Sequence, residues 1–424
     1  MDTDVTEPDR TPLDRTPTDR PDRSERTEAG SGTASAFGSV GVVGAGAMGA
    51  GIAQVAARAG HAVTLVDAVP GAAERAVEGV GAALRRLVDK GRLGADEADA
   101  VLMRITPAGS LDALPECGLV IEAVPEDLDL KRRIFADLAD LQPATTVLAT
   151  NTSSIDIDAI ADEVAEPERV LGLHFFNPPP VMALVEVVHG TRTARAFVEH
   201  ATMLMRAWGK TPVRCSSTPG FIVNRVARPF YGEAQRIVES GVADPATVDW
   251  ILRERGGFPM GPFELTDFIG QDVNLAVGTS VWEQTGHDER YAPTQLQREL
   301  VSRGRLGRKS GAGVYDYADG AAVGAEPDLD LAARLVGGPV ETDPLARTLA
   351  MLVNEAVDLV ARGEASVEDV DTAMRLGTRY PRGPVEWGRE IGFDVVARQL
   401  TELDAAFPGG RYRPSPALTD GSLG

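Results

Sequence analysis

Residues 40–60 read VGVVGAGAMGAGIAQVAARAG. The segment opens with a short apolar run of the kind found in a buried strand. A turn with glycines at Gly44, Gly46 and Gly49 follows, in the spacing GxGxxG. Small and apolar residues with helical periodicity come next. This order of strand, glycine turn and helix predicts the start of a parallel α/β sheet.

The same turn is typical of a dinucleotide site. Its glycines, with Ala47 and Met48 between them, let the backbone approach a pyrophosphate, and the helix N-terminus presents free N–H groups to it. The next predicted strand ends at Asp67, which follows Gly44 by 23 residues (67 − 44). A carboxylate there accepts hydrogen bonds from a ribose and repels a 2′-phosphate, so we predict NAD rather than NADP. A flavin nucleotide shares the turn, and a strand-end acid facing solvent is the alternative interpretation of Asp67.

Helices and strands continue to alternate up to about residue 216, which predicts a doubly wound, mostly parallel Rossmann sheet. Strand patterns then end and helical periodicity takes over. EAQRIVESGVADPATVDWILRERGGFPMGPFEL from Glu233 aligns without a gap with EAVDLVARGEASVEDVDTAMRLGTRYPRGPVEW from Glu355, at an offset of 122 (355 − 233). We therefore predict a duplicated helical domain. The expected parts are a disordered tail (1–37), a Rossmann domain (38–216), two helical copies (217–320 and 343–424) and a connector (321–342).

Composition narrows the classes of partner. The net charge of −21 over 424 residues argues against nucleic acid or an anionic membrane as a partner. Cys117 and Cys215 are the only cysteines and lack a metal or redox spacing, so we expect no metal site and a reducing compartment, the cytoplasm by default. No stretch is long and apolar enough for a membrane span.

Two unusual polar residues occur in LGLHFFNPPPVMALVEVVH, residues 171–189. His174 and Glu186 each lie in an apolar run that reads as a buried strand, where neither belongs without a partner. The prolines at 178–180 end the first strand and enforce a turn, so the two strands should lie side by side. A glutamate bonded to one imidazole nitrogen leaves the other free as a base. A lone core histidine is the alternative interpretation.

Five ordered motifs together resemble the L-3-hydroxyacyl-CoA dehydrogenase family from about Val40 to Tyr317: NTSS (151–154), GLHFFNP (172–178), LVEVV (184–188), PGFIVNR (219–225) and FPMGPFEL (258–265). The second helical copy and RYRPSPAL (411–418) resemble longer bacterial members associated with 3-hydroxybutyryl-CoA and 3-hydroxyadipyl-CoA. The resemblance implies a Rossmann domain followed by helical domains like the C-terminal domain of 6-phosphogluconate dehydrogenase.

The resemblance also implies residue roles. His174 would be the general base and Glu186 would orient it, while Ser153 and Asn224 would bind the oxygens of an acyl-CoA substrate. Four further residues match positions that contact NAD in relatives: Glu126, Lys131, Asn177 and Lys309. Lys90 falls where the family meets the phosphates of coenzyme A, and it forms a basic patch with Arg85, Arg86 and Arg92.

Several alternatives remain open. Ser153 could cap a helix, Asn224 could be a helix-start residue, the arginines could form an ordinary solvated face, and Lys309 could be a surface lysine. A non-catalytic NAD-binding protein and a dehydrogenase of a hydroxy acid without CoA are the rival functions. Because Asn224 maps onto Ala346, the second copy lacks that polar group. We expect this copy to pack on the first as an intramolecular pseudo-dimer, on the surface that shorter relatives use to dimerise; a homodimer of the whole chain is also open.

Overall fold

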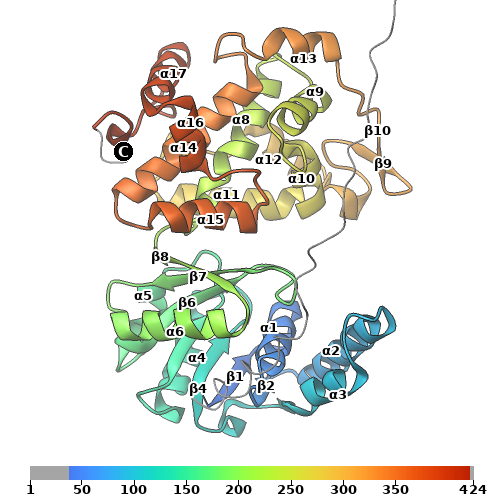
Figure 1. Cartoon of the computed structure of the whole chain (residues 1–424), viewed down its shortest axis with the longest axis vertical. Helices are drawn as coiled ribbons and strands as arrows, with labels where there is room; N and C mark the ends of the chain where they lie inside the picture. The colour runs from blue at the N-terminus through green and yellow to red at the C-terminus, as the bar shows by residue number, and fades with distance from the viewer. Residues whose placement is uncertain (1–37, 421–424) are drawn as a thin grey trace, which may run out of the picture.

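The computed structural model describes residues 38–420, so the predicted disordered tail (1–37) lies outside the described residues. A Rossmann domain forms one half of the molecule and helices form the other (Figure 1). The sheet has eight strands in the order β3-β2-β1-β4-β5-β6-β7-β8, and all of its neighbours pair in parallel except β6 and β7. The predicted fold class, a doubly wound sheet followed by helical domains, is confirmed. The strands are β1 (Ser39–Val43), β2 (Val63–Val66), β3 (Ile105–Ala108), β4 (Cys117–Glu122), β5 (Val147–Thr150), β6 (Val170–Phe175), β7 (Leu184–His189) and β8 (Thr211–Ser216).

Helices bury both faces of the sheet. Side chains alternate along the strands: Val42 and Leu173 join one apolar core, with residues of α1 and α6, while Val120 and Leu148 join the other, with residues of α4 and α5. A sheet covered on both sides explains why its strands read as nearly continuous apolar runs. The helices of this domain are α1 (Ala47–Arg58), α2 (Ala72–Asp89), α3 (Ala95–Met103), α4 (Leu128–Leu141), α5 (Ile157–Ile160) and α6 (Arg195–Ala207).

The glycine turn between β1 and α1 requires its glycines. Gly44 has φ 102°, and a Cβ there would lie 2.7 Å from the carbonyl oxygen of Ala123. A Cβ on Gly49 would overlap the carbonyl oxygen of Gly44. Close packing of the α1 N-terminus on the strand ends therefore excludes any side chain at these two positions.

The remaining helices lie on the other side of the molecule: α7 (Val223–Val226), α8 (Arg228–Glu239), α9 (Pro245–Trp250), α10 (Pro262–Ile269), α11 (Gln271–Gln284), α12 (Gln295–Ser302), α13 (Leu329–Leu335), α14 (Pro344–Ala361), α15 (Val367–Gly377), α16 (Pro384–Ile391) and α17 (Phe393–Ala406). A π-helical turn at Ile251–Arg255 extends α9. Within residues 38–420, no helix is long and apolar enough to cross a membrane. No cluster of metal-ligand side chains occurs in that same range.

The expectation that strands end near residue 217 is wrong. A short hairpin, β9 (Asp316–Ala318) and β10 (Ala321–Val323), follows the first helical copy. Its two-residue turn is Asp319-Gly320, and both residues have positive φ (50° and 81°). Asp-Gly is a strong signal for such a turn, and the strands were missed because they are short and largely exposed. The segment 321–342 therefore contains β10 and α13 as well as connecting chain.

The two helical copies share local architecture at the offset of 122. Asp249 accepts hydrogen bonds from the N–H groups of Phe263 and Glu264 at the start of α10. Asp371 does the same for Val385 and Glu386 at the start of α16. Each capping carboxylate therefore ties two helices of its own copy together.

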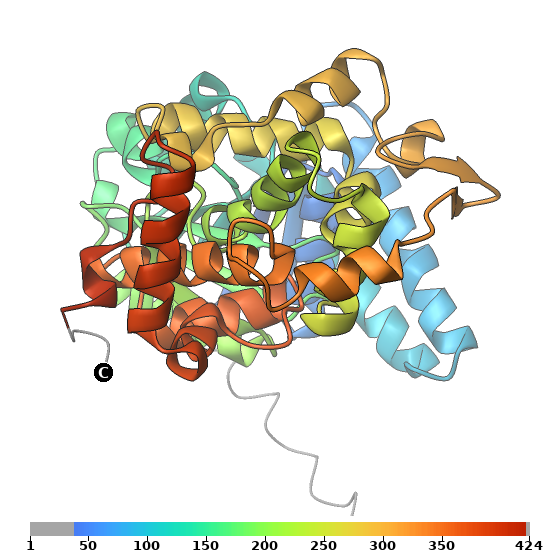
Figure 2. The ribbon, with the colours of Figure 1, turned by 90° about the horizontal axis from the view of Figure 1, so that it is seen from above.

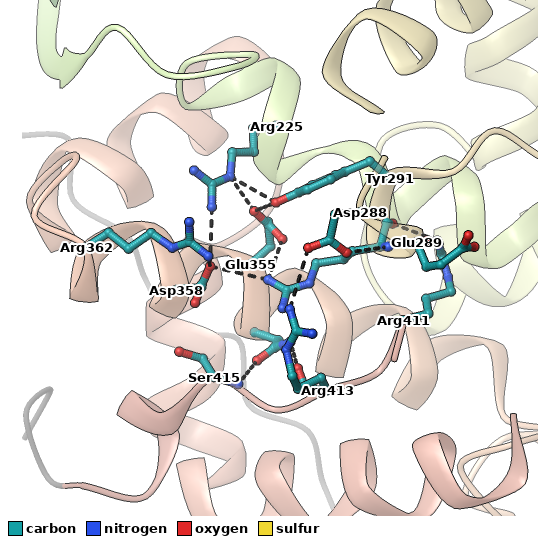
Figure 3. Close-up of polar contacts among 12 residues, drawn as sticks. Arg225, Asp288, Glu289, Tyr291, Glu355, Asp358, Arg362, Arg411, Arg413 and Ser415 are labelled. Carbon is teal, nitrogen blue, oxygen red and sulfur yellow. Dashed lines mark hydrogen bonds and ion pairs between the residues drawn. The ribbon is translucent and has the colours of Figure 1, made fainter. Parts of the chain in front are cut away.

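The copies lie above the Rossmann domain in the view of Figure 1 and side by side when seen from above (Figure 2), with α8 packed on α14. Glu233 of α8 is fully buried and binds three groups of the second copy: Arg347 (2.8 Å), Arg411 (2.8 Å) and the hydroxyl of Tyr412 (2.8 Å). The buried Glu355 of α14 correspondingly binds groups of the first copy (Figure 3), namely Arg225, Arg290 and Tyr291.

These two carboxylate clusters are related by the repeat, since Arg225 and Arg347 differ by 122, and Tyr291 and Tyr412 by 121 (347 − 225; 412 − 291). The second copy also contacts the Rossmann domain directly. The N–H of Ser216 on β8 donates to the carbonyl of Glu364 (2.8 Å), and α15 packs against β7 and β8. The second copy is thus fixed to both other parts of the chain.

Replacing Glu233 by glutamine should lower the free energy of unfolding by about 3 to 5 kcal/mol at pH 7, because Arg347 and Arg411 would remain buried without an anion. Burial opposes ionisation of Glu233, but Arg411 and Arg347 outweigh it and lower the pKa of this carboxyl from near 4.5 to about 2. A depressed pKa stabilises the fold above the unfolded value, and this contribution is lost as pH falls from about 4.5 towards 2. Urea unfolding at pH 7 and at pH 3 measures the difference.

The matched control is Glu199→Gln in the exposed Arg195–Glu199 pair of α6, which should change the same quantity by less than about 0.5 kcal/mol. This account of the interface would be contradicted if Glu233→Gln lowered the free energy of unfolding by no more than the control does. It would also be contradicted if the loss of unfolding free energy were larger at pH 3 than at pH 7.

Candidate active site

His174 and Glu186 face each other on neighbouring strands. β6 and β7 pair antiparallel, with His174 directly opposite Glu186. The chain reverses between them through Asn177-Pro178, whose peptide bond is cis. Nδ1 of His174 lies 2.6 Å from Oε2 of Glu186, and both side chains are buried. With Nδ1–H donating to the carboxylate, Nε2 is left as the acceptor of the ring.

The second oxygen of Glu186 reaches the helical half of the molecule. Oε1 accepts from the N–H groups of Ile222 (3.2 Å) and Val223 (2.9 Å), at the start of α7. Glu186 is fully buried, so these bonds satisfy a carboxylate that water does not reach. One side chain therefore holds both the imidazole and the first turn of the helical domain.

Aromatic rings enclose the histidine. Phe176 lies 4.6 Å and Phe221 5.8 Å from the imidazole, between ring centroids. Phe221 adopts φ 48°, which is uncommon for a residue with a side chain and marks local strain in the PGFIVNR turn. This conformation places an aromatic ring against His174 while the following N–H groups bind Glu186. The surroundings of the imidazole are thus apolar, with one carboxylate partner.

Ser153 and Asn224 belong to the loops beside this pair. Ser153 lies just after β5 and is half-buried, and its N–H donates to Glu126 (3.1 Å). Asn151, at the start of the same loop, accepts from the N–H of Phe175 (2.9 Å) and so fixes the loop to the strand that carries His174. Asn224 comes directly after the two N–H groups that bind Glu186 and is also half-buried.

A charge cluster formed by the exposed Glu126 and the buried Lys131 supports the Ser153 loop. Glu126 accepts hydrogen bonds from Thr152 (2.5 Å) and Ser154 (3.1 Å). Burial works against its ionisation, but Thr152 and Lys131 together with the loop N–H lower the pKa of Glu126 overall. Lys131 is 1% exposed and lies 3.4 Å from Glu126. The acid is therefore held as an anion in a fixed position.

The structure ties Lys131 mainly to Glu122, a residue that the sequence analysis did not single out. Its Nζ donates to both oxygens of that fully buried carboxylate, at 2.8 and 2.9 Å. Lys131 thus lies behind Glu126 and has almost no exposed surface. Glu122 lies within the apolar run GLVIEAV (118–124), and an acid within a buried strand is the same signal that identified Glu186.

The glycine turn is open where a dinucleotide would approach. A Cβ built on Gly46 meets nothing within 4 Å, and α1 begins there without a side-chain cap, which leaves its first N–H groups available. Asp67, at the end of β2, accepts from the N–H groups of Ala45 (2.7 Å) and Val69 (2.9 Å). The carboxylate is thereby fixed beside the turn, so these residues fit a pyrophosphate and its ribose.

The other predicted contacts lie apart from the His174–Glu186 pair. Lys309 is on a short helical turn and donates to exposed Asp272 (2.6 Å); among the described residues it contacts neither His174 nor the glycine turn. Asn177 is exposed at the cis peptide. The basic patch is exposed at the end of α2 and the start of the turn to α3, with Lys90, Arg85, Arg86 and Arg92 all on the surface.

Both the sheet domain and the helical copies are similar to domains of one known protein family. The family model described as the NAD binding domain of 3-hydroxyacyl-CoA dehydrogenase covers residues 39–218, which establishes this part as an NAD-binding domain. The model of the C-terminal domain matches twice, at residues 220–317 and 345–421. Both copies of the repeat therefore resemble the same domain.

Individual proteins that are similar to this chain are named as dehydrogenases of the same kind. A 3-hydroxyadipyl-CoA dehydrogenase of Escherichia coli is 43% identical over 91% of this chain and 97% of its own. A crystal structure of 3-hydroxybutyryl-CoA dehydrogenase from Escherichia coli superposes with a TM-score of 0.84 and 42% identity, covering 91% of this chain and 98% of that one. Human mitochondrial hydroxyacyl-coenzyme A dehydrogenase is 37% identical over 69% of this chain and 97% of its own. The chain therefore belongs to the 3-hydroxyacyl-CoA dehydrogenase family.

Proposed function

We propose that this protein oxidises L-3-hydroxyacyl-CoA to 3-oxoacyl-CoA with NAD as the hydride acceptor, and that the reaction is reversible. The observation that carries the proposal is the buried His174–Glu186 pair (2.6 Å) at the carboxyl side of an NAD-binding sheet. The relatives named above are dehydrogenases of 3-hydroxyadipyl-CoA and 3-hydroxybutyryl-CoA. Family membership and the intact pair favour this function over a non-catalytic NAD-binding protein.

In the proposed mechanism, Nε2 of His174 accepts the proton of the 3-hydroxyl group as hydride leaves the same carbon. Bound NAD would accept this hydride. Glu186 stabilises the imidazolium that forms and holds the ring in one tautomer, since its own position is fixed by Ile222 and Val223. In the reverse direction the imidazolium returns the proton to the 3-oxo oxygen. Ser153 and Asn224 are proposed to bind the substrate oxygens and set the distance for hydride transfer.

The cofactor is proposed to lie along the turn of Gly44, Gly46 and Gly49, with Ala47 and Met48 at the helix start and Asp67 on the adenosine ribose. Glu126 and Lys131 would act as one unit, in which the lysine fixes the acid and the acid faces the nicotinamide side. Asn177 and Lys309 remain proposals from the family resemblance. The basic patch around Lys90 is proposed to meet the phosphates of coenzyme A, which fits a polyanionic ligand on an acidic protein.

We also infer that the second helical copy occupies the surface with which shorter relatives pair. The reciprocal clusters of Glu233 and Glu355 support this inference, because a two-fold interface repeats each contact with the partners exchanged. Relatives such as (S)-3-hydroxybutyryl-CoA dehydrogenase of Ralstonia eutropha, with a TM-score of 0.65 and 38% identity, cover 67% of this chain and 100% of their own.

Removal of the proposed base is the direct test. His174→Ala should lower kcat for 3-hydroxybutyryl-CoA oxidation by about 10²- to 10⁴-fold, because the variant lacks the group that is proposed to accept the hydroxyl proton. NADH formation at 340 nm measures the rate, and NADH fluorescence titration checks that cofactor binding is retained. An alanine variant with the wild-type kcat would refute the assignment of the base.

Glu186→Gln tests the orienting role separately. The amide retains the shape and one acceptor oxygen but loses the negative charge, so kcat should fall by about 10²-fold while KM for NAD changes little. Steady-state kinetics with each substrate varied in turn distinguish the two constants. An equal loss in NAD binding would show instead that Glu186 acts on the whole domain interface.

Asp67→Ala tests cofactor choice. Loss of the carboxylate removes a ribose acceptor and the repulsion of a 2′-phosphate, so the ratio of kcat/KM for NAD over NADP should fall by at least about tenfold. The ratio is measured with a single thioester. An unchanged ratio would leave Asp67 as a support for the turn, through its bonds to Ala45 and Val69.

A further inference from the structure

Three charged groups form a cluster beside the ends of β4 and β5: the carboxylates of Glu122 and Glu126 and the ammonium group of Lys131. Lys131 can only donate, and its Nζ lies within hydrogen-bond distance of both oxygens of Glu122 (2.8 and 2.9 Å), so that acid is ionised. Thr150 donates to the same carboxylate (2.7 Å). Within residues 38–420, Lys131 is the only cation that pairs with either glutamate. Two carboxylates and one ammonium group leave the cluster with one negative charge.

This negative charge is held at the open end of the cluster, on Glu126. Lys131 lies 2.8 Å from Glu122 but 3.4 Å from Glu126, so it neutralises mainly the fully buried acid. The side chain of Glu126 is 38% exposed. Its Oε1 accepts from Thr152 (2.5 Å) and from the N–H of Ser153 (3.1 Å), which fix the carboxylate against the Ser153 loop. Burial opposes its ionisation, but Thr152 and Lys131 lower the pKa of Glu126 overall.

The strand order relates this charge to the nicotinamide half of the cofactor site. The order of the sheet reverses between β1 and β4, and a dinucleotide binds across such a point, at the carboxyl ends of the strands. The glycine turn and Asp67 follow β1 and β2, so the proposed adenosine half lies there. The nicotinamide half then belongs over the ends of β4, β5 and β6, which pair in parallel in that order. Glu126 follows β4, the Ser153 loop follows β5, and His174 lies near the end of β6.

The two redox forms of the cofactor differ in one charge at this end. The nicotinamide ring is positively charged in NAD and neutral in NADH, while the ribose and pyrophosphate groups are the same in both. Hydrogen bonds to those common groups therefore cannot separate the two forms. A fixed negative charge beside the ring can, because it attracts the oxidised form and has no net charge to attract in the reduced one.

We propose that Glu126, supported by Lys131 and Glu122, raises the affinity of this protein for NAD relative to NADH by attracting the positive charge of the nicotinamide ring. The inference rests on the cofactor site of the proposed function and adds to it a selection between the two redox forms. Such a selection favours loading with the oxidised cofactor and release of the reduced one, which suits oxidation of a hydroxyacyl thioester.

The test measures the dissociation constants of NAD and NADH with the full-length protein, without a thioester, by isothermal titration calorimetry. Glu126→Gln keeps the shape of the side chain and an acceptor oxygen for the loop but removes the charge. It should raise the ratio of the Kd for NAD over the Kd for NADH by about threefold to tenfold, the size expected for one charge in a partly solvated site. Contacts that both forms share cancel in this ratio.

Two further measurements separate the charge of Glu126 from its support of the loop. Glu126→Asp retains the charge and should keep most of the wild-type ratio, even where its shorter side chain weakens the binding of both forms. Salt screens a partly exposed charge, so the wild-type ratio should approach that of Glu126→Gln as the screening length falls from about 30 Å at 0.01 M ionic strength to about 3 Å at 1 M.

Asp137→Asn is the matched control. Asp137 is an exposed carboxylate on α4, the helix that carries Lys131, and it lies six residues beyond that lysine (137 − 131), away from the end of the helix that follows Glu126. Its replacement removes one negative charge from the same helix but leaves the Ser153 loop intact. The ratio of the two dissociation constants should change by less than about twofold.

An unchanged ratio in Glu126→Gln would overturn the proposal, as would an equal weakening of both dissociation constants or an equally large change in Asp137→Asn. These results would leave the proposed dehydrogenase activity intact, because binding is measured without a thioester. A protein that separates the two forms as expected but oxidises no 3-hydroxyacyl-CoA would refute the proposed function and leave the role of Glu126 standing. A wild-type protein that binds neither form would refute both.

Discussion

The carboxylate of Glu186 is the constraint on which the rest of the site depends. One oxygen binds the imidazole of His174, and the other binds the N–H groups that open α7. A fully buried carboxylate must have its lone pairs satisfied, so the sheet and the helical half can meet only where both partners are in place. The position of the His174–Glu186 pair therefore depends on the docking of the two halves of the molecule.

Much of this could be predicted from the sequence because the signals are local. A glycine turn between a strand and a helix has few structural solutions, and a histidine and a glutamate within apolar runs need each other as partners. The contact of Lys131 with Glu122 was harder to predict. Glu122 is nine residues away (131 − 122) on another element, and only the tertiary fold brings the two side chains together. The Asp319-Gly320 hairpin was missed for a different reason, since its strands are too short and exposed for an alternating pattern.

Duplication has separated scaffold from function within one chain. The residues that hold the copies together are present in both, as Arg225 and Arg347 or Glu233 and Glu355 show. Asn224, which is proposed to bind the substrate, is present only in the first copy, since it maps onto Ala346. The second copy lacks this proposed site residue but retains the interface residues, because the first copy still needs a surface to pack against.

The interface also specifies which surfaces pair. Each buried glutamate receives its arginines and tyrosine from the opposite copy, so a single copy that folded alone would leave both its glutamate and its arginines without their partners. Buried ion pairs add little net stability compared with apolar contacts of the same size, but a broken one is strongly unfavourable. The reciprocal clusters therefore act less as a source of stability than as a requirement that both copies fold together. Because the first copy also carries the N–H groups of Ile222 and Val223 that hold Glu186, this requirement extends to His174, which Glu186 binds.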